Sequence, residues 1–317
     1  MKRNIYSYSK LWMISFVLMG AACTNQVEDA IPVSGQPIEF SVQSDWKEIP
    51  NTRLKDDNGT MTFTGGDVIQ IFGFYNKEKK FMYDVDYPTL GQKVKLDVDG
   101  KTWNYTPKHF WPKEGKLLFL ASYPQNSIRN YGVTQPMIYD QTDNPLRRDL
   151  LWGVSDKDCA KDRTDVKITM KHALAKVNII LDNKSWGEIG TVIVSAYKAG
   201  HFIQTKDNGI PDWEFDDDDK KDIVAVFGYN DLIRDKDKSI TSFTVFILPD
   251  KITGLQMWND HNPGQRIDAS DKISEEIKKH TFEAGKVYNL TISKSNGVRK
   301  KNTNSRSIAM SVRCVSE

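Results

Sequence analysis

The sequence predicts an all-β protein built from two β-rich halves. Apolar and polar residues alternate with a period of two through much of the chain, as in Ile38-Glu39-Phe40-Ser41-Val42-Gln43, and this pattern is typical of half-buried strands. The strand candidates are short and are bounded by Gly, Pro, Asp or Asn. Short strands at this spacing indicate a β-sandwich, and 317 residues exceed one domain of about 100 to 200 residues.

The first half holds one strand candidate after another from Pro37 onward. A polar segment at 45–59 follows the first candidate and predicts a loop, since it carries Lys55-Asp56-Asp57-Asn58-Gly59, and Gly65-Gly66-Asp67 predicts a turn. The expected strands are residues 38–43, 60–64, 68–75, 81–85, 94–98, 102–105 and 117–122.

The second half repeats this organisation after a boundary near residues 165–175. No repeat of 20 to 50 residues is visible, which excludes a solenoid. The stretch 270–280 stays open between strand and helix, because Ile273 and Ile277 share a face in either. The expected strands are residues 166–170, 173–181, 191–197, 222–227, 242–248, 254–258 and 286–292.

Residues 1–22 predict a signal peptide that ends at a lipidated cysteine. Lys2, Arg3 and Lys10 precede an apolar run at 11–19, which is about half of the roughly 20 residues needed to span a bilayer. Gly20-Ala21-Ala22-Cys23 resembles a bacterial lipobox, although the commonest form has Leu or Val in place of Gly20. The alternative is an ordinary signal peptide. We expect a mature chain that begins at Cys23, with residues 23–36 as a polar, acidic tether resembling a surface-export signal.

Charge and motifs exclude several classes of function. Removing residues 1–22 leaves basic and acidic residues nearly balanced, which argues against a nucleic-acid partner. No two histidines have the spacing of a zinc helix, and no phosphate loop, nucleophile elbow or Cys-x-x-Cys pair occurs. The run from Asp216 to Asp219 could touch Ca²⁺, but four adjacent acids cannot all face one ion, which favours a solvated loop. We therefore expect no enzyme activity, cofactor or metal; pairing of Cys159 with Cys314 stays open.

Several segments together resemble the fimbrillin family of Bacteroidales, the lipoprotein subunits of type V pili. The segments are Thr52-Arg53, Gly66-Asp67-Val68-Ile69, Trp103-Asn104-Tyr105, Phe110-Trp111-Pro112, Ser122-Tyr123-Pro124, Asp149-Leu150-Leu151-Trp152-Gly153, Met170-Lys171-His172-Ala173-Leu174-Ala175-Lys176-Val177 and Phe282-Glu283-Ala284-Gly285-Lys286-Val287-Tyr288. The resemblance implies two tandem transthyretin-like β-sandwich domains, expected at residues 37–170 and 171–294, followed by a linker and C-terminal strand at 295–317. It implies a non-enzymatic subunit of a surface pilus that partners with other subunits.

The same resemblance implies maturation by an arginine-specific protease and assembly by strand exchange. Cleavage after Arg53 would make Leu54 the new N-terminus and release the first strand, whose Ile38, Phe40 and Val42 point to one face. A strand from a neighbouring subunit would then fill the groove. The candidate donor strand has Ile308, Met310, Val312 and Cys314 on one side; alternatively it completes the sheet of its own second domain. The family's common terminal Trp is absent here.

The rival hypothesis is a monomeric surface lipoprotein that binds glycans or host ligands. Exposed tryptophan rings could stack on sugars, and Trp46, Trp213 and Trp258 lie in polar surroundings. Trp103, Trp111 and Trp152 match family positions expected in the core.

Overall fold

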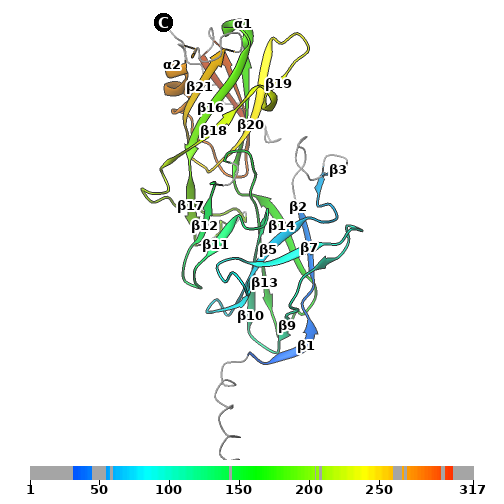
Figure 1. Ribbon diagram of the computed structural model, residues 1–317. Helices are drawn as coiled ribbons and strands as arrows, with labels where there is room; N and C mark the ends of the chain where they lie inside the picture. The colour runs from blue at the N-terminus through cyan, green and yellow to red at the C-terminus, as the bar shows by residue number, and fades with distance from the viewer. Residues whose placement is uncertain are drawn as a thin grey trace, which may run out of the picture.

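The computed structural model describes residues 31–44, 55–57, 60–142, 145–203, 205–206, 209–259, 266–267, 270–293 and 297–302. Strands dominate this part of the chain, which holds two short α-helices, so the all-β prediction is confirmed. Within it, no helix is long and apolar enough to cross a membrane. Figure 1 shows an elongated molecule with strands β1, β9, β10 and β13 toward one end and β16, β20 and β21 toward the other.

The largest sheet belongs to the first half of the chain and has eight strands. Strand β5 is apolar almost throughout and buries both faces, with Ile69 and Ile71 on one side of the sheet and Phe72 and Phe74 on the other. β6 pairs with β5, and the other strands follow the order β2-β14-β13-β10-β5-β7-β8. Their bounds are Phe40–Ser44 (β2), Val166–His172 (β14), Leu151–Asp158 (β13), Lys116–Tyr123 (β10), Val68–Tyr75 (β5), Gln92–Leu96 (β7), Trp103–Asn104 (β8) and Lys79–Met82 (β6).

Three small sheets accompany it. One joins strands from both halves of the chain, since β17 pairs with β12 through Met137 opposite Phe202. Their bounds are Val33–Pro37 (β1) with Phe110–Pro112 (β9), Lys55–Asp57 (β3) with Thr60–Thr62 (β4), and Ile128–Asn130 (β11), Met137–Asp140 (β12) and Ala199–Phe202 (β17).

The second half forms two facing sheets and two short helices. Helix α2 settles the open assignment of residues 270–280, because both Ile273 and Ile277 are buried in the core, as an i, i+4 pair on one helix face allows. One sheet contains Ile233–Arg234 (β19), Ile240–Ile247 (β20), Ala175–Asp182 (β15), Val287–Ser293 (β22) and Gly297–Asn302 (β23). The other contains Asp222–Phe227 (β18), Ile189–Tyr197 (β16) and Ile252–Asn259 (β21). The two helices are Asn183–Trp186 (α1) and Ser270–Ile277 (α2), and a 3-10 turn covers Tyr229–Asp231 (η1).

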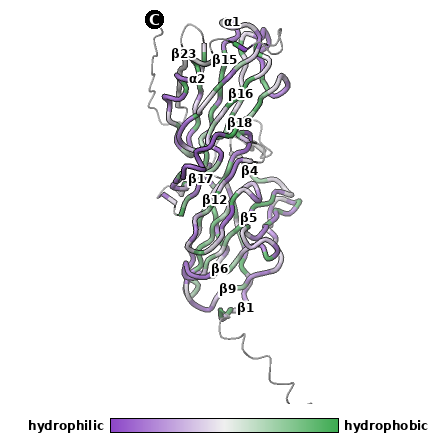
Figure 2. The backbone as a smooth tube through the Cα atoms, turned by 60° about the vertical axis from the view of Figure 1, so that its left-hand side comes forward, coloured by the Kyte–Doolittle hydropathy of each residue, from purple (hydrophilic) through white to green (hydrophobic). Residues whose placement is uncertain are grey.

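Buried apolar residues form three clusters along the molecule. The first-half cluster fills the space around Ile69, Phe119 and Ile168, and the second-half cluster surrounds Val177 and Leu290. The third, the junction cluster, includes residues of β5, β10 and β13 together with residues of β12, β17 and β20. Figure 2 shows apolar and polar residues interspersed along the backbone of both halves. The junction cluster joins the two halves through packed side chains. The division into transthyretin-like domains at 37–170 and 171–294 stays a prediction.

Three stretches expected to be irregular contain strands. β1 lies partly in the predicted tether, β3 and β4 form a hairpin in and after the predicted loop, and β23 lies in the predicted linker. Each is short or polar and forms ladder bonds with a single partner strand. Sequence periodicity detects a buried face, and backbone pairing at a sheet edge needs none.

Candidate functional site

The candidate functional site is an apolar groove, called here the first-strand groove. It is occupied by the strand predicted at residues 38–43, which corresponds to β2 with the two residues before it. β2 lies at the end of the large sheet and pairs parallel with β14, with Phe40 opposite Val166 and Val42 opposite Ile168. The backbone N–H of Val166 donates to the carbonyl of Glu39 at 2.8 Å. A parallel pair needs a long crossover, and β2 and β14 stand more than 120 residues apart in the chain. The N-terminal strand is thus held by a partner late in the first half.

Two side chains at the start of β2 are buried in the first-half cluster. Ile38, just before the strand, is 0% exposed and Phe40 is 6% exposed. The Phe40 ring meets Tyr105 and Phe119 edge to face, with ring centroids 5.6 Å and 5.5 Å away. Val42 is partly buried against the same cluster. The structure therefore brings the three residues predicted for the displaced strand together in one apolar groove.

Polar groups of the 105–109 segment hold the start of β2. The Tyr105 hydroxyl donates to the carbonyl of Ile38 at 2.8 Å, and the Ile38 N–H donates to the carbonyl of His109 at 2.9 Å. Burial raises the pKa of Tyr105 to about 12, and the negative charge of Glu39 adds to this effect, whereas the backbone of His109 opposes it. Lys108 pairs with Glu39 at 3.3 Å, but both side chains are exposed and such pairs contribute little. Sequence reasoning missed Tyr105 and His109 as partners of the strand, although Tyr105 lies in a quoted motif.

β1 attaches the preceding residues by its backbone. Val33 lies opposite Pro112 and Pro37 opposite Phe110, and the N–H of Lys113 donates to the carbonyl of Pro32 at 2.9 Å. Most β1 side chains are exposed. Because apolar burial is small here, the groove around Ile38 and Phe40 supplies most of the force that holds the segment.

The other predicted site residues lie outside the described part of the chain. They are Cys23, Arg53, Leu54, Ile308, Met310, Val312 and Cys314. Cys159 is a buried free thiol among the described residues.

The tryptophans divide as their sequence contexts indicate, with one exception. Trp103, Trp111 and Trp152 are buried, which confirms the prediction that they are core residues. Trp213, a candidate sugar platform under the rival hypothesis, is half-buried against the junction cluster: its indole N–H donates to the carbonyl of Ala173 at 2.8 Å and its ring packs edge-on against Phe202. Trp258 is half-buried on β21, and Trp46 lies outside the described residues.

A buried polar group lies beside the junction cluster, and the sequence did not predict it as a group. His172 is buried, and its Nδ1 contacts the Asp149 carboxylate, which also accepts the Leu150 N–H at 2.8 Å. Lys176 on β15 is 5% exposed, and burial lowers its pKa to about 8 against the opposing charge of Asp149. His172 and Lys176 are nearly inaccessible to solvent, which favours a structural role. Together with Asp149 they lie where the two halves of the chain meet.

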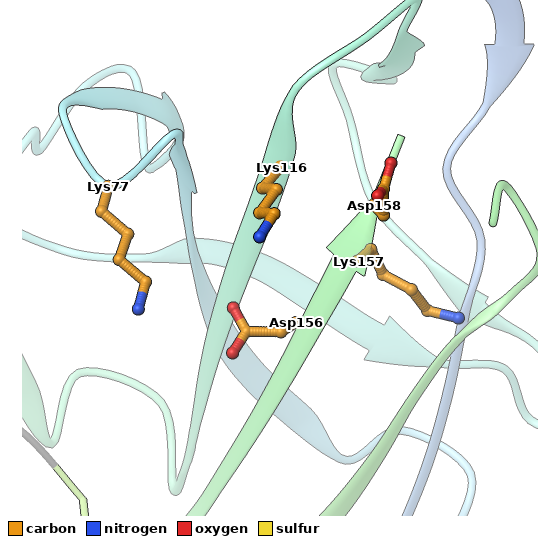
Figure 3. A pocket seen from close by; sticks show the side chains of 5 residues that line it. All are labelled: Lys77, Lys116, Asp156, Lys157 and Asp158. Atoms are coloured by element: carbon orange, nitrogen blue, oxygen red, sulfur yellow. The ribbon is translucent and has the colours of Figure 1, made fainter. Parts of the chain in front are cut away.

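A surface hollow of about 310 Å³ is lined by lysine and aspartate side chains. Figure 3 shows Lys77, Lys116 and Asp156 on one side, with Lys157 directed away from them. Lys157 pairs instead with Asp162 at 2.7 Å. Charges of both signs thus neighbour one another at this hollow, which favours no single charged ligand.

A family model described as fimbrillin-like matches residues 52–309. No curated protein matches the chain. Among solved structures, the chain is similar to a candidate cell adhesion protein from Bacteroides uniformis, with 18% identity, a TM-score of 0.50, and coverage of 84% of this chain and 96% of that one. This similarity shows a shared fold.

Two further structures align over most of their length at lower scores. One is a candidate cell adhesion protein from Bacteroides ovatus, with 12% identity, a TM-score of 0.49, and coverage of 89% of this chain and 99% of that one. The other is the fimbrial anchor protein Mfa2 from Porphyromonas gingivalis, with 10% identity, a TM-score of 0.40, and coverage of 80% and 90%.

Proposed function

The chain belongs to the fimbrillin-like family, and on this premise we propose that it is a non-enzymatic structural subunit of an adhesive cell-surface pilus. Family membership implies a cell-surface fimbrial location and association with other pilus subunits. We further propose that the subunit consists of two tandem transthyretin-like domains and reaches the outer membrane as a lipoprotein anchored through Cys23.

The observation that carries the proposal is the burial of β2 at the end of its sheet. Ile38 and Phe40 are buried in the first-half cluster, and burying such a side chain stabilises by about 1.5–3 kcal/mol. Removal of the strand would expose this apolar groove and the backbone of β14, where each buried unsatisfied polar group costs about 1–3 kcal/mol. An emptied groove would therefore bind a replacement strand strongly.

Maturation by cleavage after Arg53 would free the first strand to leave the groove when a replacement strand displaces it. Arg53 stands between β2 and β3 in the sequence, so one cut there would separate Cys23 and β2 from the rest of the chain and leave Leu54 as the N-terminus. The lipid would then deliver the subunit to the surface and depart with the first strand.

The replacement strand in this proposal comes from a neighbouring subunit. Because Ile38, Phe40 and Val42 fill the groove from one face of the strand, the donor must present apolar residues at alternate positions. Ile308, Met310, Val312 and Cys314 alternate in this way. The competing assignment places this segment in the sheet of its own second domain.

The mature N-terminus and the assembly state on cells test the proposal together. We expect sequencing of surface protein to find Leu54 at the N-terminus, and SDS-resistant ladders to form. Arg53→Ala should keep Cys23 at the N-terminus and abolish the ladders, and deletion of residues 303–317 should abolish the ladders while leaving cleavage intact. A wild-type chain that always begins at Cys23 and never forms ladders contradicts the proposal and favours the monomeric ligand-binding alternative.

A further inference from the structure

The imidazole of His201 lies among three carboxylates at the end of β17. Its Nδ1 is 2.9 Å from an oxygen of Asp219 and 4.0 Å from one of Asp216, and its Nε2 is 3.7 Å from Glu214. Glu214 reaches this place through a β-bridge to His201, with backbone bonds of 3.0 Å and 2.7 Å. The side chains of His201 and Asp219 are only 16% and 18% exposed. The local backbone thus fixes a compact group of nitrogen and oxygen atoms.

The structure sorts the four consecutive aspartates into two pairs. Asp217 and Asp218 turn outward to the lysines that follow them, Lys220 and Lys221, at 3.8 Å and 2.5 Å. Asp216 and Asp219 face His201 instead. Four adjacent acids cannot all bind one ion, but here only Asp216 and Asp219 converge. His201 of β17 adds a third possible ligand to these two.

The other nearby lysines are engaged elsewhere. Lys198, three residues before His201, pairs with Asp140 at 3.5 Å, and Lys206 pairs with Asp212 at 3.2 Å. The carboxylates around His201 therefore have a surplus of negative charge that a cation would neutralise.

We propose that His201, Asp216 and Asp219 bind a divalent transition metal ion, for which Zn²⁺ is the best match. The three ligand atoms lie within 4.8 Å of one another, whereas tetrahedral Zn²⁺ places its N and O ligands about 3.3 Å apart. Asp216 has a side chain 80% exposed, so a rotation of this side chain closes the difference. An imidazole ligand selects Zn²⁺ over Ca²⁺ and Mg²⁺, which prefer oxygen alone.

Glu214 occupies the place of an outer partner for the bound histidine. With the metal on Nδ1, the Nε2–H of His201 would have the Glu214 carboxylate 3.7 Å away, and a hydrogen bond formed between them would fix the ring and strengthen the ligand. Water would take the fourth position on the exposed side. The bound ion would tie the 216–219 turn to β17.

Zinc titration of the full chain, first stripped of metal with a chelator, tests the site by calorimetry. We expect one Zn²⁺ per chain, bound about 100-fold more weakly by His201→Ala and Asp216→Asn and about 10-fold more weakly by Glu214→Gln. Ca²⁺ should not compete at equal concentration. Asp216→Asn lies at an exposed position, so its loss of binding cannot be attributed to unfolding.

Asp217→Asn is the matched control, since this acid belongs to the same run and pairs with Lys220. It should bind Zn²⁺ as the wild type does. The proposal is overturned if the wild type binds no Zn²⁺, if Asp216→Asn binds equally well, or if Asp217→Asn weakens binding as much as Asp216→Asn does.

Discussion

Replacing Phe40 by Ala should loosen the first strand from its groove. The Phe40 side chain is 6% exposed, and its ring meets Tyr105 and Phe119 edge to face. Alanine leaves a cavity between these rings and removes most of the apolar contact of β2. The backbone ladder between β2 and β14 stays available, so the change isolates the contribution of the side chain.

The expected cost is about 3 kcal/mol. Core Phe→Ala substitutions cost about 3–5 kcal/mol, and the lower end applies because β2 lies at a sheet edge, where neighbours can move into the space. The two edge-to-face ring pairs account for about 0.5–1.5 kcal/mol each within this total. A loss of about 3 kcal/mol corresponds to a roughly 150-fold weaker hold on the strand.

Two assays measure this loss. Urea unfolding of the chain without residues 1–23, followed by tryptophan fluorescence, gives the free energy of unfolding. Cleavage after residue 53 and gel filtration then give the fraction of the first-strand fragment that stays bound. We expect the Phe40→Ala fragment to dissociate under conditions where the wild-type fragment is retained.

Ser41→Ala is the matched control, because Ser41 is the next residue on the same strand and is exposed. It should change the unfolding free energy by no more than about 0.5 kcal/mol. If Phe40→Ala costs no more than Ser41→Ala and its fragment is retained equally, β2 is not held by its side chain and the reasoning is wrong.

Three further predictions concern the surroundings of the groove and the junction. Tyr105→Phe should lower the free energy of unfolding by about 1 kcal/mol at neutral pH, because a hydrogen bond is lost. Since the folded-state pKa of Tyr105 is raised to about 12, the wild type should lose this advantage as the pH rises from about 10 to 12. Urea unfolding at a series of pH values measures this change. Lys176→Met should show the opposite pH dependence, because the folded-state pKa of Lys176 is lowered to about 8. The stability of the wild type relative to this variant should therefore rise between about pH 8 and 10. A stability difference that does not change with pH would contradict this prediction. Gly153→Ala should destabilise by about 1–3 kcal/mol, since its Cβ would lie 2.4 Å from Ile168 on β14, whereas Gly254→Ala meets only ordinary contacts at 3.5 Å and should unfold like the wild type in urea.

Many strands with a clear buried face were predicted from the sequence, although β12 and β13, which also bury residues, were not among the predicted strands. The predicted strands at 68–75 and 222–227 match β5 and β18 to the residue, and β10, β16 and β20 differ by a few residues at their ends. Period-two alternation and long apolar runs report burial directly, so these elements were readable. β1, β3 and β23 were not, because their backbones pair at sheet edges and their sequences carry no apolar alternation.

The candidate site was predictable in part for the same reason. Ile38, Phe40 and Val42 announced an apolar face, and the structure buries that face in the first-half cluster. Their partners could not be read, since Tyr105 and His109 approach β2 from a segment more than 60 residues later. The environment of Trp213 could not be predicted either, because its polar neighbours in the chain are not its neighbours in space.

The sequence by itself determined the all-β class, the apolar face of the first strand and the order of motifs that places the chain in its family, because these depend on local alternation and on residue order. Only the tertiary structure decided that β2 runs parallel to β14, that Asp149 contacts His172 and acts on the charge of Lys176 beside the junction, and that His201 joins Asp216 and Asp219. These contacts join residues brought together by sheet pairing and chain crossover, and a pattern along one chain holds no record of which distant segments will pair.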